Sequence, residues 1–171
     1  MKKIMIVDDN YLSAEGIEKN IDWETLNAEI IHVCYNGTSA IEAMKKEPAD
    51  LIISDIEMPD LDGISMSRQA LEINPMVKII LISAYDKFEY ARRALLLGAL
   101  DYIEKPLDYA YLIQKVKNAF ALMEKEQKNL QLLKQSRPLL TEKFFREITH
   151  LPSSEAAYRL KPYLKYLNLE L

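Results

Sequence analysis

The sequence predicts an α/β fold in which helices cover both faces of a doubly wound, five-stranded parallel sheet. Two observations lead to this prediction. Short apolar runs, several of them rich in Ile and Val as in strands buried on both faces, recur along the chain. Segments of helical length separate them, which is the alternation that parallel sheets require. The expected strands are Ile4–Val7, Glu29–Tyr35, Leu51–Ser54, Val77–Ser83 and Asp101–Ile103.

The expected helices agree with local start and stop signals. They are Tyr11–Asn20, Ser39–Lys46, Ile64–Asn74 and Lys87–Leu97, with a fifth that begins near Asp108. Asn36-Gly37 predicts a turn, and Ser39 and Glu42 have the spacing of a capping box at the start of the second helix. Gly98 directly follows the fourth helix, where a left-handed cap is expected.

Composition excludes several functional classes. The net charge is −4 and the pI about 5.3, which argues against a chain whose main role is to bind nucleic acid. The one cysteine, Cys34, is expected to be buried in a reducing compartment, and two scattered histidines make a zinc site improbable. No glycine-rich phosphate loop is present. The apolar run after the N-terminal lysines is too short for a signal peptide, so we expect a cytoplasmic protein.

Polar side chains gather where the predicted strands end. Asp8 and Asp9 follow the first strand and Asp55 the third. Ser83 ends the fourth strand, and Lys105 follows the fifth. Ligands of doubly wound sheets bind beyond the carboxyl ends of the strands, where the strand order reverses. Each residue alone would be an ordinary turn or surface residue. Their shared position at the ends of four strands predicts that they lie in one crevice and form a binding site.

The expected chemistry of this site is phosphoryl transfer. Neighbouring carboxylates repel one another, and a hard cation such as Mg²⁺ removes that cost while leaving room for phosphate oxygens. A carboxylate can attack phosphorus and form an aspartyl phosphate. Lysine and serine side chains can then hold the phosphoryl oxygens. The sequence therefore predicts Asp55 as a phosphoryl acceptor with Mg²⁺ as cofactor.

These motifs resemble the receiver domains of two-component response regulators, which have the CheY-like, flavodoxin-like form of the fold. The matching stretches are Ile6-Val7-Asp8-Asp9, Asp55-Ile56-Glu57-Met58-Pro59, Asp62-Gly63, Ser83-Ala84-Tyr85 and Lys105-Pro106-Leu107. Two further stretches resemble the YesN-like regulators, whose receiver leads to an AraC-type DNA-binding domain. These are Ile21-Asp22-Trp23-Glu24 and Tyr85-Asp86-Lys87-Phe88-Glu89-Tyr90-Ala91.

The resemblance implies a role for each matched position. Asp55 would accept the phosphoryl group from a sensor histidine kinase, and Lys105, followed by a cis bond to Pro106, would contact that group. Ser83 and Tyr102 would form the conformational switch. The implied Mg²⁺ ligands are Asp9 and Asp55 directly, Glu57 through its backbone carbonyl, and Asp8 often through water. The chain would not be an enzyme beyond its own phosphorylation and dephosphorylation.

The fifth helix has the pattern of a coiled coil. No Gly or Pro occurs from Leu112 to Pro138, and spacings of four and three residues join Leu112, Val116, Ala119, Met123, Glu126, Leu130 and Leu133. The pattern predicts a homodimer through this helix. A single amphipathic helix that packs on its own domain is the alternative interpretation. Two shorter helical patterns, at Thr141–Thr149 and Ser154–Leu167, follow Pro138.

We expect a receiver domain at 1–122, then a helical linker and the start of a truncated module at 123–171. DNA would be bound only by a domain absent from this chain, which would control transcription. Two rival functions stay open. Asp55-Ile56-Glu57 superficially resembles the nucleophile motif of haloacid-dehalogenase-type phosphohydrolases, although theirs follows the first strand. The other is a stand-alone receiver that acts purely as a phosphorelay or protein-binding module.

Overall fold

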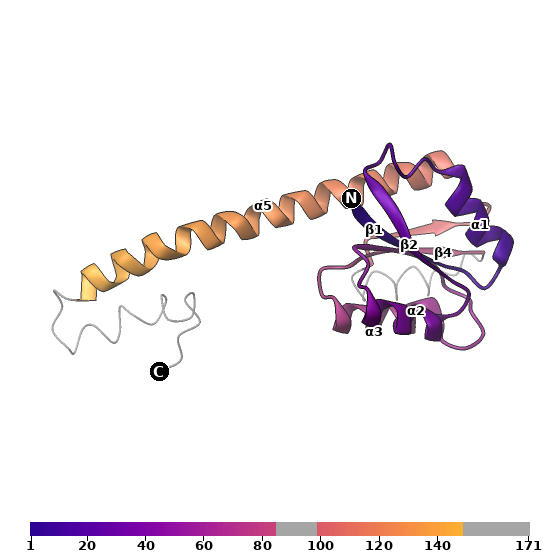
Figure 1. The fold of residues 1–171 in the computed structure, drawn as a ribbon, viewed down its shortest axis with the longest axis horizontal. Helices are drawn as coiled ribbons and strands as arrows, with labels where there is room; N and C mark the ends of the chain where they lie inside the picture. Colours follow the sequence, from indigo (N-terminus) through magenta and orange to yellow (C-terminus); the bar gives the residue numbers. More distant parts are fainter. Residues whose placement is uncertain (85–98, 149–171) are drawn as a thin grey trace. The chain divides into compact units, whose positions relative to one another are not determined.

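The structure is a computed structural model that describes residues 1–84 and 99–148, with side chains described as far as residue 132. It divides into two compact units, Met1–Ala121 and Leu122–Leu171. The first unit holds the sheet and the helices that cover it (Figure 1). The helix expected at Lys87–Leu97 and the helical pattern Ser154–Leu167 lie outside the described residues.

The sheet has five parallel strands, as the sequence predicts. They are β1 (Lys2–Val7), β2 (Ala28–Cys34), β3 (Leu51–Asp55), β4 (Lys78–Ser83) and β5 (Asp101–Glu104). Their order is β2-β1-β3-β4-β5. The chain therefore moves outward from β1 in one direction to β2 and in the other direction through β3 to β5. The order reverses between β1 and β3, which is where such sheets bind ligands.

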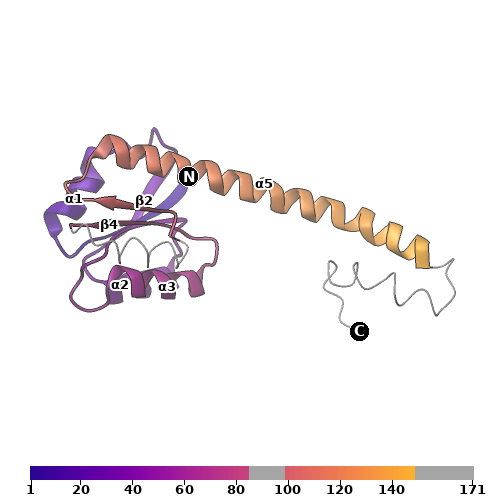
Figure 2. The same cartoon turned by 180° about the vertical axis from the view of Figure 1, so that it is seen from behind.

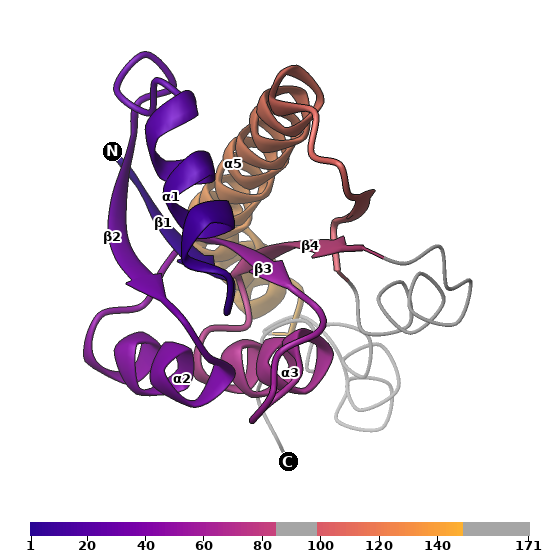
Figure 3. The same ribbon diagram turned by 90° about the vertical axis from the view of Figure 1, so that its right-hand side faces the viewer.

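Helices cover both faces of the sheet. Figure 3 shows α2 (Gly37–Lys46) and α3 (Gly63–Ile73) on one face, with α1 (Tyr11–Asn20) and the first turns of α5 (Tyr109–Ile148) on the other. The same arrangement appears from behind in Figure 2. Burial on both faces explains why β3 is buried along its entire length. The helices contribute the buried side chains Ala14, Ile17, Ala40, Ile41, Met44, Ile64, Met66 and Ala70.

Short polar side chains cap the helices in the first unit. The side chains of Asn10, Asn36 and Asp62 accept hydrogen bonds from the first backbone N–H groups of α1, α2 and α3. The expectation that Ser39 begins the second helix is wrong. Its backbone N–H donates to Asn36 Oδ1 at 2.8 Å, so Asn36 is the cap and the helix begins two residues earlier, at Gly37.

The Trp23 segment joins α1 to β2 as a structural support. Trp23 is buried, and its indole Nε1 donates to the Glu18 carbonyl at 3.2 Å. Its own carbonyl accepts from the backbone N–H groups of Leu26 and Ala28. Asn27 lies between them with a φ of 55°, a left-handed conformation that asparagine tolerates. These contacts give a packing reason for the Trp23 motif.

The helix α5 runs from Tyr109 to Ile148 and continues through Pro138. The expectation that Pro138 separates two helices is therefore wrong, and the segment that begins at Thr141 belongs to α5. An interior proline costs about 3 kcal/mol because it removes one hydrogen bond and crowds the preceding turn. Leu, Lys and Gln before it and Leu139-Leu140 after it are strong helix formers, which favours continuation.

The first part of the predicted dimer seam is buried within one chain. Leu112, Val116 and Ala119 are each 0% exposed, and Met123 is 8% exposed. Leu112, Val116 and Ala119 lie in the first unit, and their burial there agrees with the alternative interpretation, a helix that packs on its own domain. Leu130 is 46% exposed. The side chain of Leu133 lies outside the described residues.

Candidate functional site

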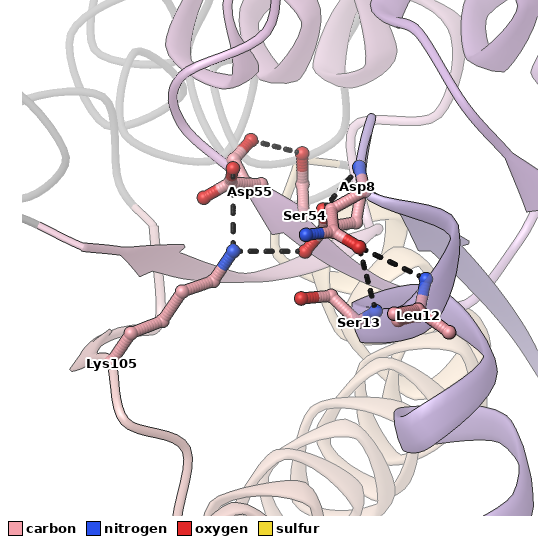
Figure 4. Close-up of polar contacts among 7 residues, drawn as sticks. Asp8, Leu12, Ser13, Ser54, Asp55 and Lys105 are labelled. Carbon is pink, nitrogen blue, oxygen red and sulfur yellow. Dashed lines mark hydrogen bonds and ion pairs between the residues drawn. The ribbon is translucent and has the colours of Figure 1, made fainter.

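The polar residues at the strand ends meet in one place. Asp8 directly follows β1, Asp55 is the last residue of β3, and Lys105 directly follows β5. Because β1 and β3 are neighbours, their two carboxylates lie side by side at the point of strand reversal. Figure 4 shows the Lys105 side chain extending toward both. The parallel topology therefore brings together residues that are up to 97 positions apart.

Asp8 is a buried carboxylate with a partner for each oxygen. It is 1% exposed. The backbone N–H of Asn10 donates to Oδ1 at 2.8 Å, and Lys105 Nζ donates to Oδ2 at 3.0 Å. The Asn10 side chain caps α1, so one residue holds both the helix start and the Asp8 carboxylate. Asp8 is thus held in a single orientation.

Asp55 is also buried, at 7% exposed, but its carboxylate is only half satisfied. Oδ2 lies 3.4 Å from Lys105 Nζ, whereas Oδ1 has no hydrogen-bond partner among the described residues. Burial raises the pKa of this carboxyl group from 3.8 to about 6, with the Asp8 charge adding to the effect and Lys105 opposing it. A buried, unsatisfied carboxylate oxygen is a place for an electrophile or a cation.

Lys105 joins the two carboxylates. Burial disfavours its ammonium, but Asp8 and Asp55 outweigh that effect, so its pKa lies above the ordinary value. The peptide bond to Pro106 is cis, as predicted. The backbone N–H of Lys105 donates to the Ser83 carbonyl at 2.8 Å, which fixes the start of the Lys105 loop on the end of β4.

Three carboxylates form a group that could hold a metal ion. Asp8, Asp9 and Asp55 each offer an oxygen, and these oxygens lie within 4.8 Å of one another. Asp9 is exposed and the other two are buried, so the group opens to solvent on one side. Mg²⁺ takes oxygen ligands, keeps several waters and commonly uses one or two carboxylates. The unsatisfied Oδ1 of Asp55 and this donor set fit such an ion.

The remaining predicted residues lie around this group. Ser83 is fully buried at the end of β4, and Tyr102 is half-buried on β5, where it packs against the hydrophobic core. Leu81 pairs with Tyr102 and Ser83 with Glu104 in the strand register, so Ser83 and Tyr102 belong to adjoining strands. Glu57 is half-buried in the segment that follows β3.

The sequence interpretation gave no role to two residues that support Asp55. Ser54 is fully buried in β3, and its hydroxyl donates to the Asp55 carbonyl at 2.8 Å. Gly63, at the start of α3, lies directly against the same carbonyl. A serine inside an otherwise apolar strand was the available signal for Ser54. Nothing in the sequence alone shows the close approach of Gly63.

The family comparison identifies this arrangement. The response regulator receiver domain family matches residues 4–117. The chain belongs to this family. It is therefore a receiver domain of the two-component signalling systems, and the residues described above lie within the matched range.

Individual relatives agree with this assignment. The uncharacterized transcriptional regulatory protein YesN of Bacillus subtilis is 29% identical over 126 residues, covering 74% of this chain and 34% of YesN. The receiver domain of AraT, a response regulator of Geobacillus stearothermophilus, has a TM-score of 0.70 at 34% identity and covers 74% of this chain and 98% of its own. A CheY from Borrelia burgdorferi, solved with CheX, BeF3 and Mg²⁺, has a TM-score of 0.64 at 29% identity, covering 70% and 89%.

This receiver chain spans less than half the length of the curated regulators it matches, 34% of YesN and 44% of the transcriptional regulatory protein HptR of Staphylococcus aureus. Several such relatives are transcriptional regulators. Within the described residues, no helix combines the length and apolar character needed to cross a membrane.

Proposed function

We propose that this receiver accepts a phosphoryl group on Asp55 from a sensor histidine kinase, with Mg²⁺ as cofactor. The observation that supports this most directly is the Asp55 carboxylate, which is buried beside Lys105 and has one oxygen without a hydrogen-bond partner among the described residues. The Asp8 oxygens both have partners, and Asp9 is exposed. Of the two buried carboxylates, Asp55 is therefore the one with an oxygen available to attack phosphorus.

Oδ1 of Asp55 would form the new bond to phosphorus as the bond from phosphorus to the donor's imidazole nitrogen breaks. The electron pair of the broken bond returns to that nitrogen, and the product is an aspartyl phosphate. Lys105 lies close enough to Asp55 to donate a hydrogen bond to a phosphoryl oxygen there. The Ser83 hydroxyl is the proposed second donor.

Asp9, Asp55, the Glu57 carbonyl and, through water, Asp8 are the proposed Mg²⁺ ligands. The ion would offset part of the charge of the three carboxylates and of the charge that develops on the phosphoryl oxygens. The Borrelia burgdorferi relative was solved with both Mg²⁺ and BeF3, which supports this proposal by analogy.

Acetyl phosphate is expected to add one phosphoryl group to the chain, at Asp55, and only when Mg²⁺ is present. Intact-mass measurement followed by peptide mapping locates the group. Asp55→Asn should remain unlabelled, while Asp50→Asn, at the opposite end of β3, should be labelled like the parent. Equal labelling of Asp55→Asn and the parent would refute the assignment. Turnover of a phosphate monoester would favour the phosphohydrolase alternative.

Ser83 and Tyr102 are the proposed switch. A phosphoryl group that bonds the Ser83 hydroxyl would draw the end of β4 inward. Tyr102 is half-buried on the adjoining strand, so it can turn further into the core when that space changes. A switch of this kind couples two sites by about 1–3 kcal/mol.

We further propose that phosphorylation strengthens a homodimer through the exposed part of α5, so that a DNA-binding domain outside this chain acts as a pair on a twofold site. The burial of Leu112, Val116, Ala119 and Met123 limits the dimer seam to the segment that begins at Leu130. Leu130 and Leu133 are the seam residues of that segment. The transcriptional relatives support this proposed output.

Light scattering with and without beryllofluoride tests the dimer. The parent should shift toward dimer when beryllofluoride and Mg²⁺ are added. Leu130→Lys/Leu133→Lys should stay monomeric, because burying two lysines per chain costs several kcal/mol. Gln131→Lys adds a lysine at an exposed position outside the seam and should dimerise like the parent. Ser83→Ala should be labelled yet fail to shift. A double variant that dimerises normally would place the interface elsewhere.

A further inference from the structure

A cavity of about 330 Å³ lies beside Asp8 and Lys105, at the start of α1 and the segment that follows β5. Asp8 and Lys105 form one wall, while Asp55 and Asp9 do not line it. Its apolar surface comes from α1, β4 and the segment that follows Lys105, through Leu12, Ile17, Ile82, Pro106 and Leu107. The volume is at the lower end of the range for small-molecule sites.

Three polar groups at this cavity have hydrogen-bonding capacity left over. The Lys105 ammonium has three N–H donors, of which Asp8 and Asp55 account for two. The hydroxyls of Ser13 and Tyr109 also line the cavity, and neither has a hydrogen-bond partner among the described residues. Figure 4 shows the Ser13 hydroxyl pointing from α1 toward the Lys105 side chain. A ligand with one oxygen could use these groups together.

The charges around the cavity select an uncharged ligand. The charge of Lys105 is already balanced by Asp8 and Asp55, so an anion would gain little electrostatic attraction from it. The anion would also be repelled by the nearby cluster of Asp8, Asp9 and Asp55. A cation would meet the Lys105 ammonium. A neutral oxygen can accept from Lys105 and exchange hydrogen bonds with Ser13 and Tyr109, while an apolar body packs on Ile17 and Ile82.

We propose that this cavity binds a small uncharged alcohol or amide with an apolar body, and that the bound molecule opposes phosphorylation of Asp55. A ligand oxygen that accepts a hydrogen bond from Lys105 in the cavity would compete with a phosphoryl oxygen on Asp55 for the same ammonium group. Occupancy of the cavity and of the acceptor site are then coupled, and the coupling must be reciprocal. The binding step is independent of the proposed function, whereas the effect on phosphorylation rests on it.

Benzyl alcohol, benzoate and benzylammonium are matched neutral, anionic and cationic probes for this site. Titration of the full chain, followed by the methyl NMR signals of Ile17 and Ile82, should give saturable shifts with benzyl alcohol. The two charged probes should bind at least about fivefold more weakly. Shifts that do not saturate, or stronger binding of either charged probe, would overturn the ligand assignment.

Two variants separate the cavity from non-specific binding. Ser13→Leu fills the cavity from α1 and should abolish the shifts, whereas Glu18→Leu adds the same side chain at an exposed position of α1 and should keep them. Tyr109→Phe removes one hydroxyl without filling the space and should weaken binding severalfold. If Ser13→Leu does not fold, Tyr109→Phe still tests whether benzyl alcohol binds in the cavity. Unchanged binding in Ser13→Leu, or in Tyr109→Phe, contradicts the proposal.

The coupling is measured in both directions. Saturating benzyl alcohol should slow labelling by acetyl phosphate, and beryllofluoride with Mg²⁺ should weaken benzyl alcohol binding by about fivefold. If beryllofluoride with Mg²⁺ leaves the affinity for benzyl alcohol unchanged, the proposed opposition between the two sites is wrong. If the parent is never labelled, the proposed function fails while saturable binding to the unmodified chain still supports the cavity as a ligand site.

Discussion

At about pH 7.5 and without divalent cations, Asp55→Asn is expected to be more stable than the parent by about 2–3 kcal/mol. Burial raises the pKa of the Asp55 carboxyl group from 3.8 to about 6, so its charged form is disfavoured in the folded protein. Asparagine has nearly the same shape and carries no charge. The measurement is urea unfolding of both proteins across a pH series.

The sign of the pH dependence follows from the raised pKa. The folded state binds the Asp55 proton more tightly than the unfolded state does, so between pH 3.8 and about 6 Asp55 is protonated in more of the folded molecules than of the unfolded ones. The parent therefore gains stability relative to Asp55→Asn as the pH falls through 6, and the difference between them disappears below 3.8. A constant difference across this range, or a parent that is the more stable protein at neutral pH, would contradict the prediction.

Glu47→Gln provides a control with the opposite sign. Lys3 holds the pKa of the exposed Glu47 carboxyl group below its ordinary value, through a hydrogen bond and its charge. Glu47 therefore contributes stability at neutral pH that is lost as the pH falls, and salt should screen the effect. The two variants should change stability in opposite directions near neutral pH.

Added Mg²⁺ should reduce or reverse the advantage of Asp55→Asn. A ligand that binds only the folded state stabilises it in proportion to its affinity and concentration. The parent offers the Asp55 carboxylate to the ion, whereas the variant offers only an amide. The measurement with Mg²⁺ therefore separates destabilisation by an unliganded Asp55 carboxylate from a general effect of asparagine on the stability of β3.

The fold could be predicted because its signals are local or follow from a general rule. Apolar runs such as Leu51–Ser54 identify strands, and the reversal rule then places Asp8, Asp55 and Lys105 together. The orientation of two consecutive aspartates could not be predicted. The structure buries Asp8 and exposes Asp9, because the hydrogen bond from the Asn10 backbone and the reach of Lys105 select Asp8.

The fifth helix shows why one pattern can have two interpretations. Apolar residues at alternating spacings of three and four produce one stripe, whether that stripe meets a sheet or a second helix. Leu112 and Val116 are buried in their own domain, whereas Leu130 is exposed, although all three satisfy the same pattern. Periodicity identifies the buried face of a helix, but only tertiary structure identifies what covers it.

The close contacts at the glycines are a second feature that the sequence alone could not predict. Gly16, Gly37 and Gly63 all lie outside the left-handed region, so their backbone conformations do not require glycine. What differs among them is the space beside each one. A Cβ on Gly16 would lie 2.6 Å from the Tyr109 hydroxyl, which is the end of a movable side chain. Gly37 approaches the Leu61 backbone instead.

Gly63→Ala is expected to destabilise the receiver by about 3 kcal/mol and to slow labelling of Asp55 by at least about tenfold. A Cβ at this position would lie well under 3.0 Å from the Asp55 carbonyl oxygen and 3.0 Å from the Ile56 Cα, so backbone must move. Ser54 holds the same carbonyl, which prevents easy relief. Urea unfolding and acetyl phosphate labelling measure the two effects.

Gly16→Ala is the matched control, because the same methyl group would be crowded by the movable Tyr109 side chain and not by backbone. Alanine also favours a helix interior over glycine by about 1 kcal/mol, so this variant should stay within about 1 kcal/mol of the parent. Its labelling should be normal, since Gly16 does not touch Asp55. If Gly63→Ala were as stable and as readily labelled as Gly16→Ala, the close packing of α3 on Asp55 would not be what positions the acceptor.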